Sequence, residues 1–255
     1  ILFETEVVSA DFERENPVIS LKTTSEEKIE IEAEFIIDSS GNGRVLASHL
    51  GLETRAQVGE NSSIFTHINE TQRPIGKEGE LITFEVLGNE SWFWYIPFSN
   101  GNSSLGFVGS NAWFEQFSNY APNEMFKIML GRLEFYRARF DGYEFLFEPK
   151  MLQNLAKNVN RLYGEKFVLT GNSAEFLDPV FSSGVAFATE SGLQAAKLVA
   201  RQLEGEQVNW EKDYAGYMKE GIDVFGSYVR EWYNGNLQKI FFHEQPNPLI
   251  KQQVC

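Results

Sequence analysis

Apolar and polar residues alternate along the first part of the chain. Segments 5–10, 17–23 and 28–37 largely follow this two-residue period, and charged or polar turns separate them. A period of two is typical of strands with one buried face, so we expect an antiparallel meander of three strands. The third segment ends in a continuous apolar run at residues 35–37, which is the pattern of a strand buried on both faces.

The middle of the chain has longer strand-like runs, interrupted by a more helical stretch at 123–140. We expect strands at 62–69, 81–86, 91–97, 103–109 and 143–147. In the third of these, alternation places Trp92 and Trp94 on one face of the strand. Phe93 and Tyr95 fall on the other face. Large rings on both faces indicate either an ordinary core strand or burial against a ligand.

Residues 166–199 predict a buried strand, a polar turn and then a helix rich in alanine and glycine that continues to about Leu203. This order brings the start of a helix to the carboxyl end of a strand, where open α/β sheets bind their ligands. Unpaired N–H groups near Ser182, Ser183 and Gly184 favour an anion or an electron-rich oxygen. An ordinary strand, turn and helix packed in a core is the alternative interpretation.

Two helical regions follow the polar turn. The first has apolar residues that we expect to pack against the core, among them Val185, Leu193, Ala196 and Val199. The second, residues 210–242, has aromatic residues at helical spacing, which we interpret as a structural stripe.

Composition narrows the classes of function. The 255 residues are 42% hydrophobic, which is enough for one sizeable domain or two modest ones. A net charge of −14 argues against binding to nucleic acid or to an anionic membrane surface. The single cysteine, Cys255, excludes a disulfide framework, and His49, His67 and His243 lack metal-ligand spacing, so we expect no metal site. We interpret these histidines as surface or packing residues.

The ends of the chain bear on its location and completeness. No apolar run approaches the roughly 20 residues that cross a bilayer, and no basic stretch followed by an apolar one opens the chain, so we expect a cytoplasmic protein. The chain begins at Ile1 without methionine, in an expected strand. This start indicates a cut, a cleaved product or an incomplete chain.

The sequence GNSAEFLDPVFSSGV, residues 171–185, resembles the second flavin-binding motif of the flavin-dependent halogenase and aromatic hydroxylase superfamily, G-D-A-A-x-F-x-D-P-x-x-x-x-G-V. In that family the early acidic residue holds the ribityl chain of FAD, and the Asp-Pro and Gly-Val pairs lie against the isoalloxazine ring. The resemblance assigns Asn172 to the ribityl chain, although Asn lacks the charge of the family's Asp. It assigns Asp178, Pro179, Gly184 and Val185 to the ring. In a halogenase, it also assigns the peptide groups around Ser182, Ser183 and Gly184 to a halide.

Two further stretches carry the same resemblance. FIIDSSGNGRVLASHLGL, residues 35–52, resembles V-V-D-A-S-G-R-x-S-x-L-A-x-x-L-G-L, with Arg44 matching the family's arginine if the spacing after Gly41 differs slightly. In the family this strand end lies near FAD, which makes Asp38 a cofactor-binding candidate; a simple strand cap is an equal alternative. WFWYIP resembles W-x-W-x-I-P of flavin-dependent halogenases, which implies that Trp92 and Trp94 border a substrate pocket.

The G-x-G-x-x-G segment that opens such flavoproteins is absent, so the resemblance covers only the later part of the family's pattern. It implies an α/β fold with mixed α+β character. We expect an FAD-binding Rossmann-like domain of the aromatic hydroxylase type that lacks its N-terminal βαβ unit. An antiparallel β substrate domain is inserted in it, and helices close the chain. The expected boundaries are 1–58 and 151–204 for the FAD-binding domain, 59–150 for the substrate domain and 205–255 for the helices.

The resemblance implies an FAD-dependent oxidoreductase, halogenase-like or monooxygenase-like, that uses reduced flavin and O₂ on an electron-rich apolar or aromatic substrate. Expected partners are a small molecule, free or tethered to a carrier protein, a flavin reductase and, in a halogenase, a halide ion. No lysine matches the context of the halogenase lysine, so no catalytic residue is assigned. A reductase resembling the geranylgeranyl reductases and a degenerate, non-catalytic acidic fragment remain open alternatives.

Overall fold

The computed structural model describes residues 1–245 and 247–254, so Cys255 lies outside the described residues. The chain divides into two compact units, which are described separately: 1–58 with 156–229, and 59–155 with 230–255. The expected domain boundaries stay predictions. Within the described part of the chain, no helix combines the length and the apolar character needed to cross a bilayer.

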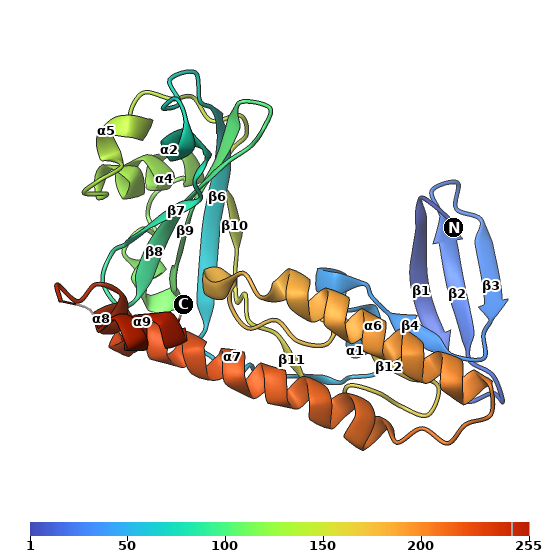
Figure 1. The fold of residues 1–255 in the computed structure, drawn as a ribbon. Helices are drawn as coiled ribbons and strands as arrows, with labels where there is room; N and C mark the ends of the chain where they lie inside the picture. Colours follow the sequence, from blue (N-terminus) through green and yellow to red (C-terminus); the bar gives the residue numbers. More distant parts are fainter. Residues whose placement is uncertain (246, 255) are drawn as a thin grey trace. The chain divides into compact units, whose positions relative to one another are not determined.

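The first unit contains the predicted meander and the predicted strand, turn and helix (Figure 1). Its strands are β1 (Thr5–Asp11), β2 (Val18–Thr23), β3 (Lys28–Glu32), β4 (Ile36–Asp38), β5 (Glu53–Thr54), β11 (Asn158–Val159) and β12 (Phe167–Leu169). Its helices are α1 (Val45–His49) and α6 (Gly184–Leu203), with short 3-10 turns η1 (Gly41–Gly43), η2 (Gly171–Ser173) and η3 (Pro179–Phe181). A π-helical segment, η4 (Glu211–Gly216), leads into α7 (Tyr217–Tyr233), which ends in the second unit.

The meander is confirmed, but the expected third strand at 28–37 is two strands in different sheets. β3 pairs with β2 in antiparallel fashion, whereas β4 pairs with β12 in parallel, with Ile36 opposite Phe167 and Asp38 opposite Leu169. β3 is largely exposed, whereas Ile36 and Asp38 of β4 are buried. Ile37 is 39% exposed, so the expected burial of this strand on both faces is wrong. The apolar run therefore belongs to the parallel pair.

β12 is the centre of the first unit because its two faces pack against different hydrophobic clusters. Phe167 and Leu169 pack in one cluster with β4 and α1, and Val168 packs in a second cluster with α6 and the π-helical segment. Successive side chains of a strand point to opposite faces, so three buried residues connect both clusters. This burial fixes the strand end from which the GNSAEFLDP turn departs.

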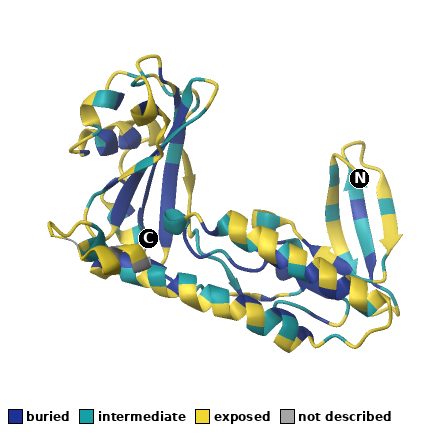
Figure 2. Ribbon diagram, in the orientation of Figure 1, coloured by how far each residue is buried: buried dark blue, intermediate teal, exposed yellow. Residues whose placement is uncertain are grey.

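The predicted end of α6 at Leu203 is confirmed, but most of its predicted packing positions are wrong. Val185 is 76% exposed, Leu193 is 52% exposed and Ala196 is exposed, whereas Val199 is buried as expected. The buried stripe instead contains Ser191, Ala195, Leu198 and Val199, and Figure 2 shows buried and exposed colours mixed along this helix. Val185, Leu193 and Ala196 are as apolar or small as the residues of the buried stripe, so the apolar positions alone did not distinguish the core-facing side.

The second unit is built on a five-stranded antiparallel sheet with the order β10-β6-β9-β8-β7. The strands are β6 (Asn61–Asn69), β7 (Thr83–Val86), β8 (Ser91–Pro97), β9 (Asn102–Ser110) and β10 (Lys150–Leu152). The helices are α2 (Lys77–Glu80), α3 (Asn111–Glu115), α4 (Pro122–Gly131), α5 (Arg137–Phe140), α8 (Asn236–Phe241) and α9 (Pro248–Val254). The predicted strand at 143–147 is wrong: it makes only one bridge, from Phe145 to Ile68, because the register changes before β10 pairs with β6.

Alternation along β8 separates the two faces of this sheet as predicted. Phe93 and Tyr95 are fully buried in a core with Phe107 of β9, Phe126 of α4 and Phe140 of α5. The aromatic side chains at the alternate positions lie on the opposite face and are covered less completely. One face of the sheet therefore carries the core, and the other carries a separate group of rings.

Candidate functional site

The carboxyl ends of β4 and β12 form a single hydrogen-bonded unit. The carbonyl oxygen of Asp38 accepts from the Thr170 N–H at 2.9 Å, from the Thr170 hydroxyl at 3.0 Å and from the Ser173 hydroxyl at 2.7 Å. The hydroxyls of Ser39 and Thr170 lie 2.8 Å apart. Parallel strands end at the same sheet edge. The two predicted flavin motifs, far apart in sequence, thus lie together in space.

Arg44 clamps these two turns. Its guanidinium is nearly fully buried and donates from Nη1 to the Asn172 carbonyl at 2.9 Å and from Nη2 to the Asn158 carbonyl at 3.0 Å. Its Nε donates to Glu53 at 2.7 Å. Arg44 also has a φ of +48°, a left-handed backbone conformation that is uncommon outside glycine. The side-chain amide of Asn172 donates to Asn42 at 3.2 Å, which ties the turns a second time.

Asp38 and Asp178 are both predicted to contact the cofactor, but each carboxylate accepts hydrogen bonds from backbone N–H groups of the chain itself. Asp38 accepts from the Ser40 N–H and from the Leu46 N–H, each at 2.8 Å, so it caps the turn into α1. Asp178 is buried and accepts from the Val180 N–H at 2.9 Å, which caps η3. These contacts favour the capping interpretation of Asp38. Direct contact of either carboxylate with a cofactor stays a prediction.

The start of α6 lies beside the Asn172 turn. Ser182 has a φ of +51°. Ser183 precedes the 20-residue helix, and its side chain makes no capping hydrogen bond, so it provides no acceptor for the first N–H groups of the helix. A Cβ placed on Gly184 would lie 3.8 Å from Oδ1 of Asn172 and 3.5 Å from Phe176, which is ordinary contact. The next residue, Val185, is mostly exposed. The structure thus brings together the residues assigned to the ribityl chain and to the ring.

Trp92 and Trp94 belong to the second unit and lie on the same face of its sheet. The indole N–H of Trp92 donates to the Tyr233 hydroxyl at 3.0 Å, and that of Trp94 donates to the Ser104 hydroxyl at 3.1 Å. The Trp94 ring lies flat over Gly106, where a Cβ would come within 2.2 Å of the ring. Glycine at this position of β9 is therefore required for the ring's placement.

These tryptophans are the end of a continuous row of rings, which we call the aromatic face. The row is made by Trp92, Trp94, Phe65, Phe147, His67 and Phe98, with successive ring centroids 4.9 to 6.4 Å apart. Burial among the rings lowers the pKa of His67 below its usual value, which favours a neutral imidazole. Sequence reasoning found the tryptophans but not His67, because its neighbours come from strands that are distant in sequence.

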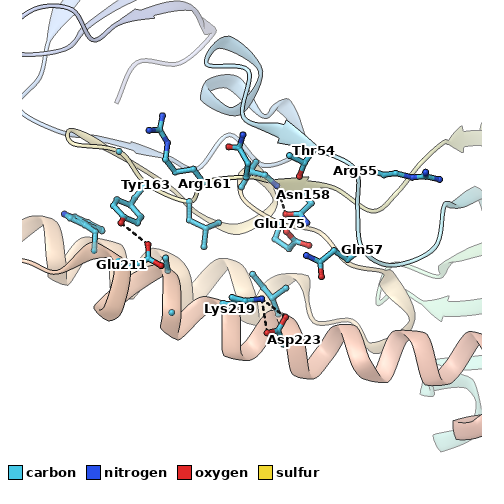
Figure 3. Close-up of a pocket in the computed structure, with 18 of the residues that line it drawn as sticks. Thr54, Arg55, Gln57, Asn158, Arg161, Tyr163, Glu175, Glu211, Lys219 and Asp223 are labelled. Atoms are coloured by element: carbon cyan, nitrogen blue, oxygen red, sulfur yellow. Dashed lines mark hydrogen bonds and ion pairs between the residues drawn. The ribbon is translucent and has the colours of Figure 1, made fainter.

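The first unit also contains a cavity of about 890 Å³, shown in Figure 3. It lies among the 54–57 and 158–165 segments, the π-helical segment and α7. None of the residues predicted to hold the cofactor lines it, but Glu175, from the same motif, does. Glu175 is 8% exposed, and burial raises its pKa to about 8 despite the nearby cations Arg44 and Lys219. Sequence reasoning missed this residue because it occupies a variable position of the motif.

Comparison with known proteins identifies the family. The family model described as "Tryptophan halogenase" matches residues 2–239. The chain belongs to the tryptophan halogenase family. This membership and the structural matches below confirm the predicted fold class and the predicted superfamily.

The relatives of this chain within the family include pyrrole halogenases. It is 26% identical to a 1H-pyrrole-2-carbonyl-[peptidyl-carrier protein] chlorinase of Pseudomonas fluorescens, over 94% of this chain and 55% of the relative. A crystal structure of a flavoprotein/dehydrogenase from Cytophaga hutchinsonii is 43% identical, with a TM-score of 0.93, over 98% of this chain and 61% of that one. The flavin-dependent brominase Bmp2 shares the fold at 19% identity and a TM-score of 0.83, over 98% of this chain and 63% of that one. The chain thus spans between half and two thirds of the length of these proteins.

Proposed function

We propose that this chain is part of a flavin-dependent, halogenase-like oxidoreductase whose FAD lies at the carboxyl ends of β4 and β12 and at the start of α6. The observation that carries the proposal is the clamped pair of turns, in which Arg44 fixes the Asn172 backbone beside Gly184. The 43% identical flavoprotein and the halogenase relatives support it. In open α/β sheets this edge is the usual ligand site.

The residues present fit a flat cofactor that carries negative charge when reduced. Gly184 has no side chain at the helix start, and Val185 offers an exposed apolar surface beside it. The N-terminus of α6 carries a partial positive charge that favours negative charge on a bound ring or a bound halide near Ser182 and Ser183. The carboxamide of Asn172 can donate to or accept from a ribityl hydroxyl. When bound, FAD supplies the redox chemistry, and these residues orient it.

For the substrate, we propose an electron-rich aromatic molecule that lies against the aromatic face of the second unit. The rings of Phe65, Trp94 and Phe147 suit stacked or edge-on contact with a planar molecule. The neutral imidazole of His67 can accept a hydrogen bond from a ring N–H or a phenolic O–H. The carrier-tethered pyrrole substrates of two relatives make a tethered substrate the first to test.

Halogenation is the reaction that the relatives favour, since the curated matches are named as halogenases, chlorinases or brominases. It requires a halide ion and O₂, with reduced flavin delivered by a reductase. Direct transfer of oxygen to the same substrate is the second candidate, because the same cofactor site and aromatic face would serve a monooxygenase. Omission of chloride or bromide from the assay distinguishes the two reactions.

The cofactor site is tested by replacing Gly184 with Val in the protein that carries this chain. The added side chain would project toward Asn172 and block the ring, so FAD affinity should fall at least tenfold, as measured by quenching of flavin fluorescence. Gly192→Val is the matched control, because it makes the same change in the same helix where no atom lies within 4 Å of the added Cβ. Equal FAD affinity in the two variants would show that the cofactor lies elsewhere.

A further inference from the structure

The wall of the cavity in the first unit contains a buried polar group that has no hydrogen-bond partner among the described residues. Glu175 is more than nine-tenths buried and lines the cavity (Figure 3). Among the described residues, no hydrogen bond reaches its carboxyl group. Buried polar side chains in folded proteins nearly always have such a partner. The missing partner is therefore expected to come from a molecule in the cavity.

Most charged side chains around the cavity contact a neighbouring side chain or extend away from it, and Glu165 is exposed. The Lys219 ammonium pairs with Asp223 at 3.0 Å, and the Tyr163 hydroxyl donates to Glu211 at 3.0 Å. Figure 3 shows the long side chains of Arg55 and Arg161 extending away from the cavity. Among the described residues, the cationic side chains that line the cavity are thus either paired or directed away from it, which does not favour a negatively charged ligand.

Apart from these groups and the exposed Glu165, the polar lining is uncharged. Gln57, Asn158 and Asn160 are carboxamides, and Thr54 is a hydroxyl. Each of these groups both donates and accepts hydrogen bonds. Glu175 belongs with them when its carboxyl group is protonated, which burial favours because it penalises the ionised form. The apolar part of the wall comes from residues Val159, Leu162, Ala215 and Ile222.

A protonated carboxyl group presents a donor and an acceptor side by side. A carboxamide or a lactam presents the complementary pair, so the two groups can form two parallel hydrogen bonds. The volume of about 890 Å³ falls in the usual range for small-molecule sites. We infer that this cavity binds an uncharged small molecule with a carboxamide or lactam group, recognised through Glu175. This site is separate from the residues proposed to hold FAD.

A series of three benzene derivatives of similar size tests the inference in the purified protein. Benzamide is neutral, benzoate is an anion and benzylamine is a cation at neutral pH. Saturation-transfer NMR at pH 7 should show saturable binding of benzamide and binding of the two ions that is at least tenfold weaker. Benzamide at about 10 mM should bind detectably even if each of its non-hydrogen atoms contributes little binding free energy.

Variants of Glu175 locate the site. Glu175→Leu should weaken benzamide binding at least tenfold, whereas Glu175→Gln, which keeps a donor beside an acceptor, should stay within threefold of the parent. Glu204→Leu replaces an exposed glutamate outside the cavity and should change nothing. If Glu175→Leu does not fold, the comparison of the three ligands and the Glu175→Gln variant still test the inference.

Three outcomes would overturn the inference. No benzamide binding at 10 mM would mean that the cavity holds only water. Tightest binding of benzylamine would mean that Glu175 acts as an anion. Benzamide binding that Glu175→Leu leaves unchanged would place the ligand elsewhere. Because FAD is absent from the assay, none of these outcomes depends on the proposed flavin site.

Discussion

Glu70 in the second unit and Glu175 in the first are both more than nine-tenths buried, yet their carboxyl groups have opposite surroundings. The Glu70 side chain is fully buried and accepts from the Ser103 hydroxyl at 2.6 Å and the Tyr95 hydroxyl at 2.8 Å. It also accepts from Arg139 at 2.9 Å and Arg73 at 3.1 Å. Burial alone would raise the pKa of Glu70, but these hydrogen bonds outweigh it and hold the pKa below its usual value.

Glu175 has burial without these donors, so its pKa rises to about 8. The difference shows how a buried carboxyl group can be assigned a role. A carboxylate whose acceptor sites are all filled by the fold stabilises one conformation and leaves nothing for a ligand. A carboxyl group without a partner at the wall of a cavity reduces stability when ionised and is available for binding. We therefore interpret Glu70 as structural and Glu175 as a binding residue.

Removal of the Glu70 side chain is expected to have the largest effect. Glu70→Ala leaves Arg73 and Arg139 largely buried without their carboxylate, which should lower the free energy of unfolding by about 3 to 5 kcal/mol. Urea unfolding followed by tryptophan fluorescence measures the loss. Glu78→Ala, at an exposed position of α2, should stay within about 0.5 kcal/mol of the parent. A loss below about 1 kcal/mol for Glu70→Ala would contradict the structural role.

The second prediction concerns pH. The pKa of Glu175 is about 8 in the folded protein, against 4.5 as its usual value, so the folded form retains a proton that the unfolded form releases. The stabilisation from this proton is complete below about pH 4.5 and is lost as the pH rises through about 8. Between pH 6 and pH 8 it should fall by about 2 kcal/mol. Glu175→Gln, which cannot ionise, should remove this part of the pH dependence in parallel urea titrations. Equal slopes for parent and variant would show that Glu175 is ionised throughout.

The sequence could not predict that Glu70 has hydrogen-bond donors around its carboxylate and that Glu175 has none among the described residues. The faces of β8 followed from alternation, and the order of strand, turn and helix around β12 followed from apolar runs and turn residues. The donors to Glu70 lie up to 69 residues away, and Arg44 reaches a carbonyl 128 residues away. Local patterns predict which residues are buried, but the partners of a buried polar group depend on how distant segments come together.

The same limit applies to the candidate site. A motif resemblance found Asn172 and Gly184, which the structure places together, but it also suggested Asp38, whose carboxylate caps the chain's own N–H groups. Arg44 was recognised only as a position in a pattern. Its role as a clamp depends on burial and on two carbonyl partners, neither of which leaves a local signal in the sequence.

A smaller effect should follow from removing one donor to Glu70. Tyr95→Phe deletes the hydroxyl but keeps the ring, over which Arg139 lies at 4.3 Å. A hydrogen bond to a charged group contributes about 1.5 kcal/mol or slightly more, so the free energy of unfolding should fall by about that amount at pH 7. The pKa of Glu70 should rise, because one of the groups that favours its charged form is gone. Carbon-detected NMR titration of the Glu70 carboxyl would contradict this prediction if it showed an unchanged or lower pKa.

The smallest effect is expected for Lys219→Met. The Lys219 side chain is 66% exposed and pairs with an exposed carboxylate, so stability at pH 6 should change by less than about 0.5 kcal/mol. Lys219 nevertheless favours the charged form of Glu175, so its loss should raise the pKa of Glu175 slightly. An NMR titration of the Glu175 carboxyl measures this shift, with Lys197→Met on α6 as an exposed control. A fall in the pKa of Glu175, or an equal shift in the control, would mean that the Lys219 ammonium does not act on this carboxyl and that burial and Arg44 set its pKa.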